Sequence, residues 1–264
     1  MRTTFLDLVG TRPLIGMVHL LPLPGAPGWG GSMQDVLTRA VSDARAIENG
    51  GLDAIMIENY GDVPFYPGAV PPETVAALTA AASAVMEATS LPVGINVLRN
   101  DAAAALAIAT AVGARFIRVN VHTGAMLTDQ GWIAGQAHDT LRRRASMGSD
   151  VAILADVFVK HATPPAGMSI EEAARDTRER GKADALIVSG SGTGQPVDPE
   201  RLVRVRAAAP GAPLLIGSGF TAETAATLLE HADGAIVGSA IQQDGIAGRP
   251  IDPARVAALR RVVL

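Results

Sequence analysis

The segment DAAAALAIATAVGARFIRVN, residues 101–120, decides the fold because it contains one complete unit of a repeating pattern. Residues 101–112 have the composition of an alanine-rich helix, and Gly113 follows as a stop signal. Residues 116–120 are a short run of branched apolar residues ending in the polar Asn120, which is typical of a buried strand. Helices alternating with buried strands indicate an α/β protein with a parallel sheet.

The same alternation runs along the whole chain. Eight apolar runs predict strands over residues 14–19, 53–58, 92–96, 116–120, 151–156, 185–189, 213–217 and 234–238. Helical patterns cover residues 34–49, 72–89, 101–112, 130–147, 170–180, 199–209, 221–231 and 252–263, with Ser169, Asp198, Thr221 and Asp252 as N-caps. Eight strand–helix units in 264 residues predict one domain, residues 1–264, folded as a single (β/α)8 TIM barrel.

An open, doubly wound α/β sheet is the alternative architecture. The barrel is favoured because a polar residue stands at the end of each predicted strand, and a closed barrel brings all eight strand ends to one rim. These residues are His19, Glu58, Asn96, Asn120, Asp156, Ser189, Ser218 and Ser239. The long connections 20–34 and 60–71, together with segment 122–132, are expected to lie over that rim.

Composition excludes several classes of protein. The chain is 48% hydrophobic and 18% charged, with no cysteine, which excludes a disordered chain and a disulfide scaffold and favours a cytoplasmic location. A net charge of −4 argues against nucleic acid as a partner. Apolar windows such as residues 102–112 are too short for membrane insertion, which needs about 20 residues. The alanine-rich helices favour a homo-oligomer.

Three glycine-rich turns follow the last three predicted strands. Glycine lets the backbone approach a ligand, and exposed N–H groups can bind an anion, so these turns predict a phosphate site. Its expected residues are Ser189, Gly190, Gly192, Gly194, Gly217, Ser218, Gly219, Gly238 and Ser239. The alternative is that the glycines only make tight turns. None of the turns is a Walker A loop or a Rossmann fingerprint in its proper place.

Carboxylates at strand ends are candidates for acid–base chemistry. Side chains alternate along a strand, so Glu58 and Asp156 are expected to point into the barrel, where Arg118 points as well. A buried guanidinium needs an anionic partner, so one of these two carboxylates must pair with Arg118. Each therefore has two open interpretations, as a catalytic group or as a structural ion-pair partner. Asp156, which is nearer the rim, is favoured as the acid–base group, with Glu58 as an orienting group.

Only two of the 22 basic residues are lysines, and one of them has a notable position. Lys160 lies four residues after Asp156, where it can reach over the barrel mouth as an electrophile, a phosphate partner or a proton carrier. His19 and His122, at or after strand ends, are further candidates for acid–base work. Asn96, Asn120, Arg118 and His161 are expected to orient the substrate. No metal-binding motif is present, so no metal ligands are predicted, although a divalent metal beside a carboxylate stays open as a cofactor.

Several ordered motifs resemble those of the BtpA/SgcQ family. They are Leu14-Ile-Gly-Met-Val-His-Leu20 with Pro22-Leu-Pro-Gly25, Asp53-Ala-Ile-Met-Ile-Glu-Asn-Tyr-Gly-Asp62, Gly94-Ile-Asn-Val-Leu-Arg-Asn-Asp101, Phe116-Ile-Arg-Val-Asn120, Ile153-Leu-Ala-Asp-Val157 with Val159-Lys-His161, and Val237-Gly-Ser239. The resemblance extends essentially from end to end. It departs at Phe158, where the family pattern is expected to have a histidine.

The resemblance implies a phosphate-binding TIM barrel. Photosynthetic members of that family are linked to photosystem I biogenesis, and others lie among sugar-uptake genes or are labelled nucleotide hydrolases. The favoured hypothesis is an enzyme, namely a lyase, isomerase or hydrolase, that acts on a small phosphorylated metabolite such as a sugar or nucleoside phosphate. The alternative is a non-enzymatic assembly or stability factor of the photosystem I biogenesis type.

Overall fold

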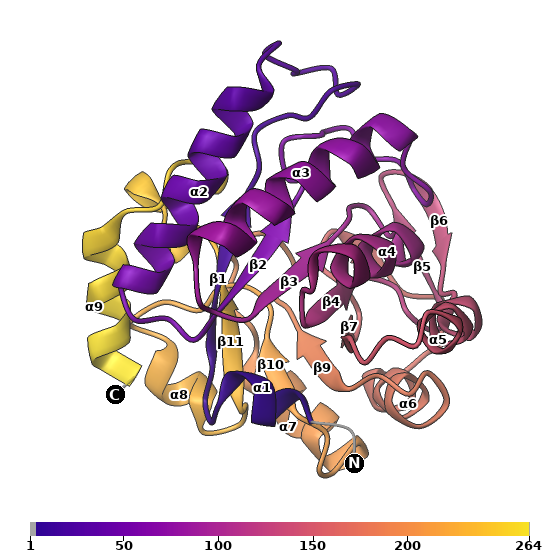
Figure 1. Cartoon of the computed structure of the whole chain (residues 1–264). Coiled ribbons are helices and arrows are strands. Elements are labelled where there is room, and N and C mark those ends of the chain that lie inside the picture. The colour runs from indigo at the N-terminus through magenta and orange to yellow at the C-terminus, as the bar shows by residue number, and fades with distance from the viewer. Residues whose placement is uncertain (1–3, 264) are drawn as a thin grey trace.

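Eight parallel strands close into a barrel, as the sequence predicts (Figure 1). The computed structural model describes residues 4–263. In barrel order the strands are β1 (Leu14–His19), β2 (Ala54–Glu58), β3 (Val93–Asn96), β4 (Phe116–Val119), β7 (Ala152–Asp156), β9 (Ala185–Val188), β10 (Leu214–Ile216) and β11 (Gly234–Val237). Since β11 pairs in parallel with β1, the sheet is closed and the carboxyl ends of all eight strands form one rim.

Helices surround the barrel and cover the outer face of its strands (Figure 1). They are α2 (Met33–Asn49), α3 (Pro72–Ala88), α4 (Ala102–Val112), α5 (Ala137–Ser146), α6 (Ile170–Arg175), α7 (Pro199–Ala208), α8 (Ala225–Leu229) and α9 (Pro253–Val263). A π-helix, η1 (Asp176–Arg180), continues α6, and two 3₁₀ turns, η2 (Ser239–Ile241) and η3 (Gln243–Gly245), follow β11. The predicted N-caps Ser169 and Asp198 are confirmed, since each side chain accepts a backbone N–H of its helix.

The strands separate two apolar cores. Ile55 and Ile57 of β2 belong to the larger core beneath the helices. Met56 belongs to the inner core, where it lies with Ile15 and Phe116. This alternation confirms the expected direction of side chains on β2. Glu58 has the same parity as Met56, so its side chain lies on the barrel side.

A short helix that the sequence analysis did not predict lies at the amino-terminal end of the barrel. α1 (Phe5–Val9) packs Phe5 against Phe116 with ring centroids 5.7 Å apart, and Val9 joins the same inner core. A helix of five residues is too short for its periodicity to be recognised in a sequence. It closes the end of the barrel opposite the rim.

The predicted helix over residues 130–147 is wrong in its first part. β5 (Ala125–Thr128) and β6 (Gly131–Ala134) form a hairpin there, and β8 (Ala162–Thr163) adds a third antiparallel strand. Gly131 has φ 89°, a left-handed conformation that favours glycine and turns the chain between β5 and β6. Only residues 137–146 form the helix α5.

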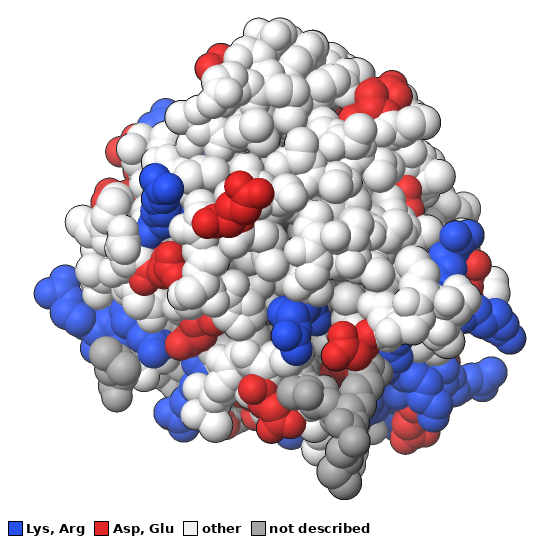
Figure 2. Space-filling model, viewed as in Figure 1, with Lys and Arg blue, Asp and Glu red and all other residues white. Residues whose placement is uncertain are grey.

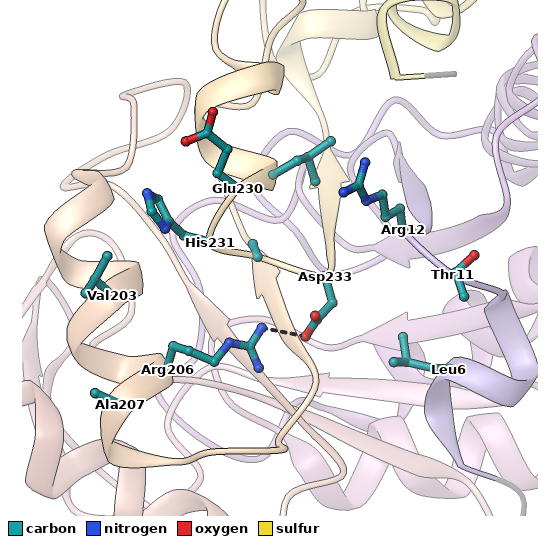
Figure 3. Close-up of a pocket in the computed structure, with 11 residues that line it drawn as sticks. Leu6, Thr11, Arg12, Val203, Arg206, Ala207, Glu230, His231 and Asp233 are labelled. Carbon is teal, nitrogen blue, oxygen red and sulfur yellow. Dashed lines mark hydrogen bonds and ion pairs between the residues drawn. The ribbon is translucent and has the colours of Figure 1, made fainter.

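Three aspartates hold neighbouring strands together at the amino-terminal end of the barrel. Asp53 accepts the N–H of Leu14 at 2.8 Å and donates its own N–H to the carbonyl oxygen of Leu14 at 3.0 Å. The same reciprocal pair joins Asp184 to Ile153 and Asp233 to Leu214. Each aspartate also pairs with an arginine of an outer helix, namely Arg260, Arg144 and Arg206, respectively. Figure 3 shows the pair of Arg206 and Asp233 in a pocket at this end of the protein.

We expect Asp53→Ala to lower the free energy of unfolding by about 2 kcal/mol, because the Leu14 N–H and the Arg260 guanidinium both lose their partner. Urea unfolding of the variant and the natural protein measures the difference. Asp139→Ala is the control, because Asp139 pairs with Arg143 on the exposed surface, where such pairs contribute about 0–1 kcal/mol. Equal losses in the two variants would contradict a role for Asp53 in joining the strands.

The face shown in Figure 2 has no continuous basic area, because its Lys and Arg side chains lie among Asp and Glu side chains. The upper and central part of this face, over α3 and α4, is largely uncharged. Ala76 and Ala80 of α3 and Ala107 of α4 are exposed. The homo-oligomer stays a prediction. Of the helices in residues 4–263, none combines the length and apolar character needed to span a bilayer.

Candidate active site

Two adjoining pockets open at the carboxyl-terminal rim. The first, the cradle pocket, is lined by Met17, His19, Glu58, Arg118, Lys160, Thr193, Gly194, Gly217, Ser218, Gly219, Phe220, Ile236, Gly238, Ser239 and Ala240. The second, the outer pocket, is lined by Glu58, Tyr60, Val63, Phe65, Leu98, Arg99, Asn120, Asp129, Lys160, His161 and Thr193. Glu58, Lys160 and Thr193 line both, so the two pockets meet at these side chains.

The glycine-rich turns after β9, β10 and β11 form one side of the cradle pocket. Of the nine predicted phosphate-binding residues, Gly194, Gly217, Ser218, Gly219, Gly238 and Ser239 line it. Ser189, Gly190 and Gly192 do not line it, and Ser189 is buried below, where its hydroxyl donates to Asp156 at 3.3 Å.

The turn at Gly219 combines a left-handed backbone conformation with backbone N–H groups that have no acceptor in the described part of the chain. Gly219 has φ 68°, and a Cβ there would lie 2.2 Å from the carbonyl oxygen of Gln195, so loop packing alone requires a glycine. Among residues 4–263, the N–H groups of Gly219 and Phe220 have no acceptor. The turn therefore offers two backbone donors beside the pocket, as an anion site requires.

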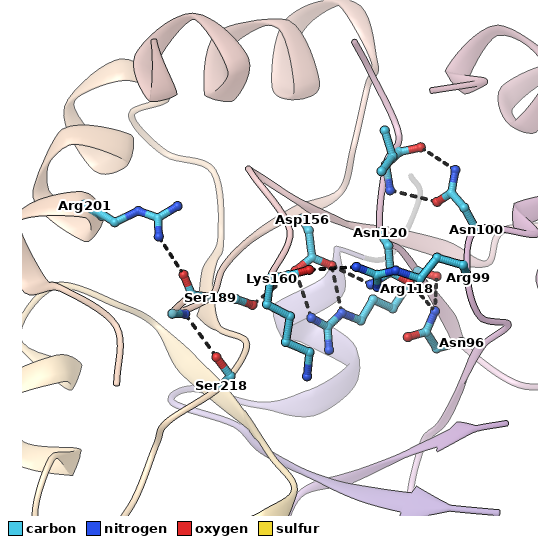
Figure 4. A network of polar contacts seen from close by, with 12 residues as sticks. Asn96, Arg99, Asn100, Arg118, Asn120, Asp156, Lys160, Ser189, Arg201 and Ser218 are labelled. Carbon is cyan, nitrogen blue, oxygen red and sulfur yellow. Dashed lines mark hydrogen bonds and ion pairs between the residues drawn. The ribbon is translucent and has the colours of Figure 1, made fainter. Parts of the chain in front are cut away.

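The buried base of the site is an ion pair between neighbouring strands. Arg118 of β4 donates Nε to Oδ2 and Nη2 to Oδ1 of Asp156, both at 2.8 Å, and each side chain is at most 2% exposed (Figure 4). Asn120 and Ser189 donate to the same carboxylate. Because its oxygens are occupied in this way, Asp156 is placed as the partner of Arg118, which is the structural interpretation left open by the sequence.

Glu58 is the carboxylate at the junction of the two pockets. It is only 5% exposed, and its nearest ionisable partner is Nε2 of His19 at 3.7 Å, beyond hydrogen-bond distance. Burial raises the pKa of Glu58, although the positive charges of Lys160 and Arg118 act in the opposite direction. A carboxyl group whose pKa is raised in this way is a stronger base than an ordinary carboxylate, as a general base requires.

Lys160 lines both pockets at the same junction as Glu58. Its side chain makes no hydrogen bond or ion pair with any residue in the described range 4–263, and in Figure 4 it extends away from Asp156. Burial lowers the pKa of Lys160, and Arg118 lowers it further, while Glu58 raises it. The structure thus brings the predicted lysine into the mouth with its amine available to a ligand.

His19 is held as a neutral ring. Its Nδ1 accepts hydrogen bonds from the Gln242 amide at 2.9 Å and the Gly248 N–H at 3.2 Å, which leaves the proton on Nε2 facing Glu58. The ring stacks on Tyr60 with centroids 4.2 Å apart. Burial, followed by the charge of Lys160, lowers the pKa of His19 to about 3.

This depressed pKa predicts a pH dependence of stability. The unfolded histidine takes up a proton below its ordinary pKa of about 6.5, whereas the folded one does so only near about 3. Stability from His19 is therefore fully present above pH 6.5 and is lost as the pH falls toward 3, by up to about 1.4 kcal/mol per pH unit.

We expect His19→Asn to flatten the fall in melting temperature between pH 6.5 and 4, since an asparagine oxygen still accepts from Gly248 without gaining a proton. His138→Asn, at an exposed position of α5, is the control. Parallel pH curves for the natural protein and the His19 variant would be the contrary result.

The remaining predicted residues separate into two groups. Asn120 and His161 line the outer pocket, where Nε2 of His161 accepts the N–H of Thr193 at 3.1 Å. Asn96 is buried, lines neither pocket, and donates to Asn120. His122 is buried, lines neither pocket, and contacts the carbonyl oxygen of Gly181 at 2.8 Å. Its proposed catalytic role therefore gains no geometric support.

Arg99 and Tyr60 are mouth residues that the sequence analysis did not select. Each follows a predicted strand end by one to three residues, which was the available signal. Gln242, which holds His19, comes from the turn after β11 and is 223 residues away in sequence, so no local pattern connects the two. Loops that converge over the rim supply these residues.

Phe158, at the departure from the expected family pattern, lines neither mouth pocket. It borders a separate hollow between the segments after β4 and β7, with Met168. As for a metal, no group of three or more His, Asp or Glu side chains within residues 4–263 is arranged to hold one.

Comparison with known proteins agrees with the fold and the motifs. The profile of the BtpA family matches residues 10–263. The photosystem I biogenesis protein BtpA of Synechocystis is 50% identical over 94% of this chain and 86% of its own length. An uncharacterized protein of Pyrococcus abyssi is 45% identical over 97% of both chains, and the sgc region protein SgcQ of Escherichia coli is 33% identical over 95% and 94%.

Solved structures show the same architecture at low sequence identity. A native KDPGal structure has a TM-score of 0.58 at 15% identity, covering 95% of this chain and 93% of its own. A tryptophan synthase structure from M. tuberculosis has a TM-score of 0.61 at 18% identity, covering 97% and 93%. These similarities establish the TIM-barrel fold. The profile match and the relatives named above show that this chain belongs to the BtpA family.

Proposed function

We propose that the protein is an enzyme that binds a small phosphorylated metabolite, a sugar or nucleoside phosphate, at the carboxyl-terminal rim. The observation that carries the proposal is the junction where Glu58 and Lys160 both line the glycine-rich cradle pocket and the outer pocket. A phosphate in the cradle pocket would accept hydrogen bonds from backbone N–H groups of the turn after β10 and from the Lys160 ammonium group.

The chemistry that fits this junction is proton transfer at carbon. Glu58 would take a proton from a carbon next to a carbonyl group, and Lys160 would stabilise the negative charge that develops on the carbonyl oxygen. Isomerases and lyases share this step, so they are favoured over hydrolases. Asp156 would act indirectly by holding Arg118 beneath the cradle pocket.

A negative charge placed in the cradle pocket tests the phosphate site. We expect Ser239→Asp to weaken binding of inorganic phosphate and glycerol 3-phosphate at least about tenfold, because two anions would occupy the same space. Isothermal titration calorimetry measures the binding, and Ser239→Ala serves as the matched control, with affinity within about twofold of the natural protein. Unchanged binding in Ser239→Asp would refute the phosphate site.

A non-enzymatic role is the second candidate, since the relative at 50% identity is named a photosystem I biogenesis protein. It requires a partner-binding surface and no turnover. If Glu58→Gln and Lys160→Met left the cellular role of the protein intact while ligand binding was lost, the non-enzymatic role would replace the enzymatic one.

A further inference from the structure

Arg99 is a buried cation in the outer pocket without an acidic partner. Its side chain follows β3 and is 5% exposed. One nitrogen, Nη2, donates to the carbonyl oxygen of Lys160 at 2.7 Å (Figure 4). Within residues 4–263, no carboxylate lies within 4.0 Å of its guanidinium, in contrast to Arg118, which pairs with Asp156. Buried charges in proteins are normally paired, so the unpaired one calls for a ligand.

The buried charges around the mouth do not balance. Arg118 and Asp156 neutralise each other, and His19 is neutral. Of the residues that line the two pockets, Arg99 and Lys160 then remain, and only Glu58 supplies a buried carboxylate. Asp129 also lines the outer pocket, but it is exposed and its carboxylate accepts a hydrogen bond from the Gln130 amide. A phosphate in the cradle pocket complements Lys160, which lines that pocket, but Arg99 lines only the outer one. One buried positive charge is therefore left in the outer pocket, away from the turns after β10 and β11.

We infer that the substrate carries a second anionic group at the end opposite its phosphate, and that Arg99 binds this group in the outer pocket. The inference rests on the phosphate site proposed above. The substrate class is thus a phosphorylated acid or a bisphosphate of a small carbon chain, with the reacting carbon between the two anionic ends and beside Glu58.

The donors of the outer pocket suit an oxyanion. A guanidinium has five N–H groups, and only one of its nitrogens is engaged with Lys160, so donors remain for a carboxylate or phosphate. His161 adds a donor at the same pocket, because Thr193 donates to its Nε2 and so leaves the ring proton on Nδ1.

Matched ligand pairs test the inference. Calorimetry on the full-length protein compares glycerol 3-phosphate with 3-phosphoglycerate, and glucose 6-phosphate with 6-phosphogluconate and fructose 1,6-bisphosphate. We expect the doubly anionic ligand to bind about tenfold more tightly than its singly anionic counterpart in at least one set. The last set distinguishes a second carboxylate from a second phosphate.

Arg99→Gln then assigns the preference to Arg99. Glutamine can still donate to the Lys160 carbonyl oxygen, so the loop keeps its contact while the charge is lost. The variant should lose the preference and keep its affinity for the singly anionic ligand within about twofold. Arg143→Gln, which removes an exposed charge on α5, should change neither value.

Two results would overturn the inference. The first is that the natural protein binds the singly and doubly anionic ligands of every set with equal affinity. The second is that Arg99→Gln loses affinity equally for singly and doubly anionic ligands, which would mean that Arg99 only supports the loop that carries Lys160. In both cases the natural protein still binds glycerol 3-phosphate, so the proposed phosphate site is not contradicted. If no phosphorylated ligand binds the natural protein, the proposed function fails and this inference fails with it.

Discussion

Asp156→Ala is expected to destabilise the protein by about 3–5 kcal/mol, the largest loss of stability among the substitutions considered. The variant leaves the Arg118 guanidinium, 2% exposed, inside the barrel without the two hydrogen bonds that it makes to Asp156. An unpaired buried charge costs far more than the pair itself contributes. Chemical denaturation monitored through Trp29 and Trp132 fluorescence measures the change.

The double variant Arg118→Met with Asp156→Leu provides the control. It removes both charges together, so it should recover most of the stability that Asp156→Ala loses. If Asp156 instead served mainly as a free catalytic carboxylate, Asp156→Ala would change stability by less than about 1 kcal/mol. That outcome would reject the structural assignment.

Glu58→Gln is expected to lower turnover about 10²- to 10⁴-fold, the loss typical of removing a general base. The amide keeps the shape of the side chain but cannot take a proton from carbon. Incubating the protein with a panel of sugar phosphates in D₂O and detecting deuterium in the recovered compounds by mass spectrometry measures this step directly. Glu87→Gln, exposed on α3, is the matched control and should keep full exchange. Undiminished exchange in Glu58→Gln would exclude Glu58 as the base.

The pH profile of exchange gives an independent signature. Glu58 must be ionised to act, and burial raises its pKa, so the acidic limb of kcat/KM should lie above the ordinary carboxyl value of about 4.3. Lys160 must be protonated, and burial lowers its pKa, so the alkaline limb should lie below about 10.4. Removing the Glu58 charge should move the alkaline limb lower still, because Glu58 raises the pKa of Lys160.

The strand–helix pattern was sufficient to predict the barrel and to identify the site residues that lie on strands. Strand parity placed Glu58, Arg118 and Asp156 inside the barrel, because alternation along a strand is a local property of the backbone. The hairpin at β5 and β6 was missed, since four-residue strands carry too little pattern to compete with a neighbouring helix.

Which carboxylate is structural and which is free was decided only by the tertiary structure. From the sequence, either Glu58 or Asp156 could pair with Arg118, and Asp156 was favoured as the acid–base group because it lies nearer the rim. In the folded barrel β4 lies directly beside β7, so Arg118 donates hydrogen bonds from Nε and Nη2 to Asp156. Glu58 does not pair with Arg118 and lines the two mouth pockets instead.

The sequence by itself determined the barrel, the polar rim and the family, because these depend on periodicity, composition and ordered motifs within single segments. The tertiary structure alone decided the pairing of Arg118 with Asp156, the neutral state of His19, and the burial of Arg99 without a carboxylate partner within residues 4–263. These properties depend on distances and burial among loops up to 223 residues apart, since desolvation and Coulomb interactions arise only once the chain has closed on itself.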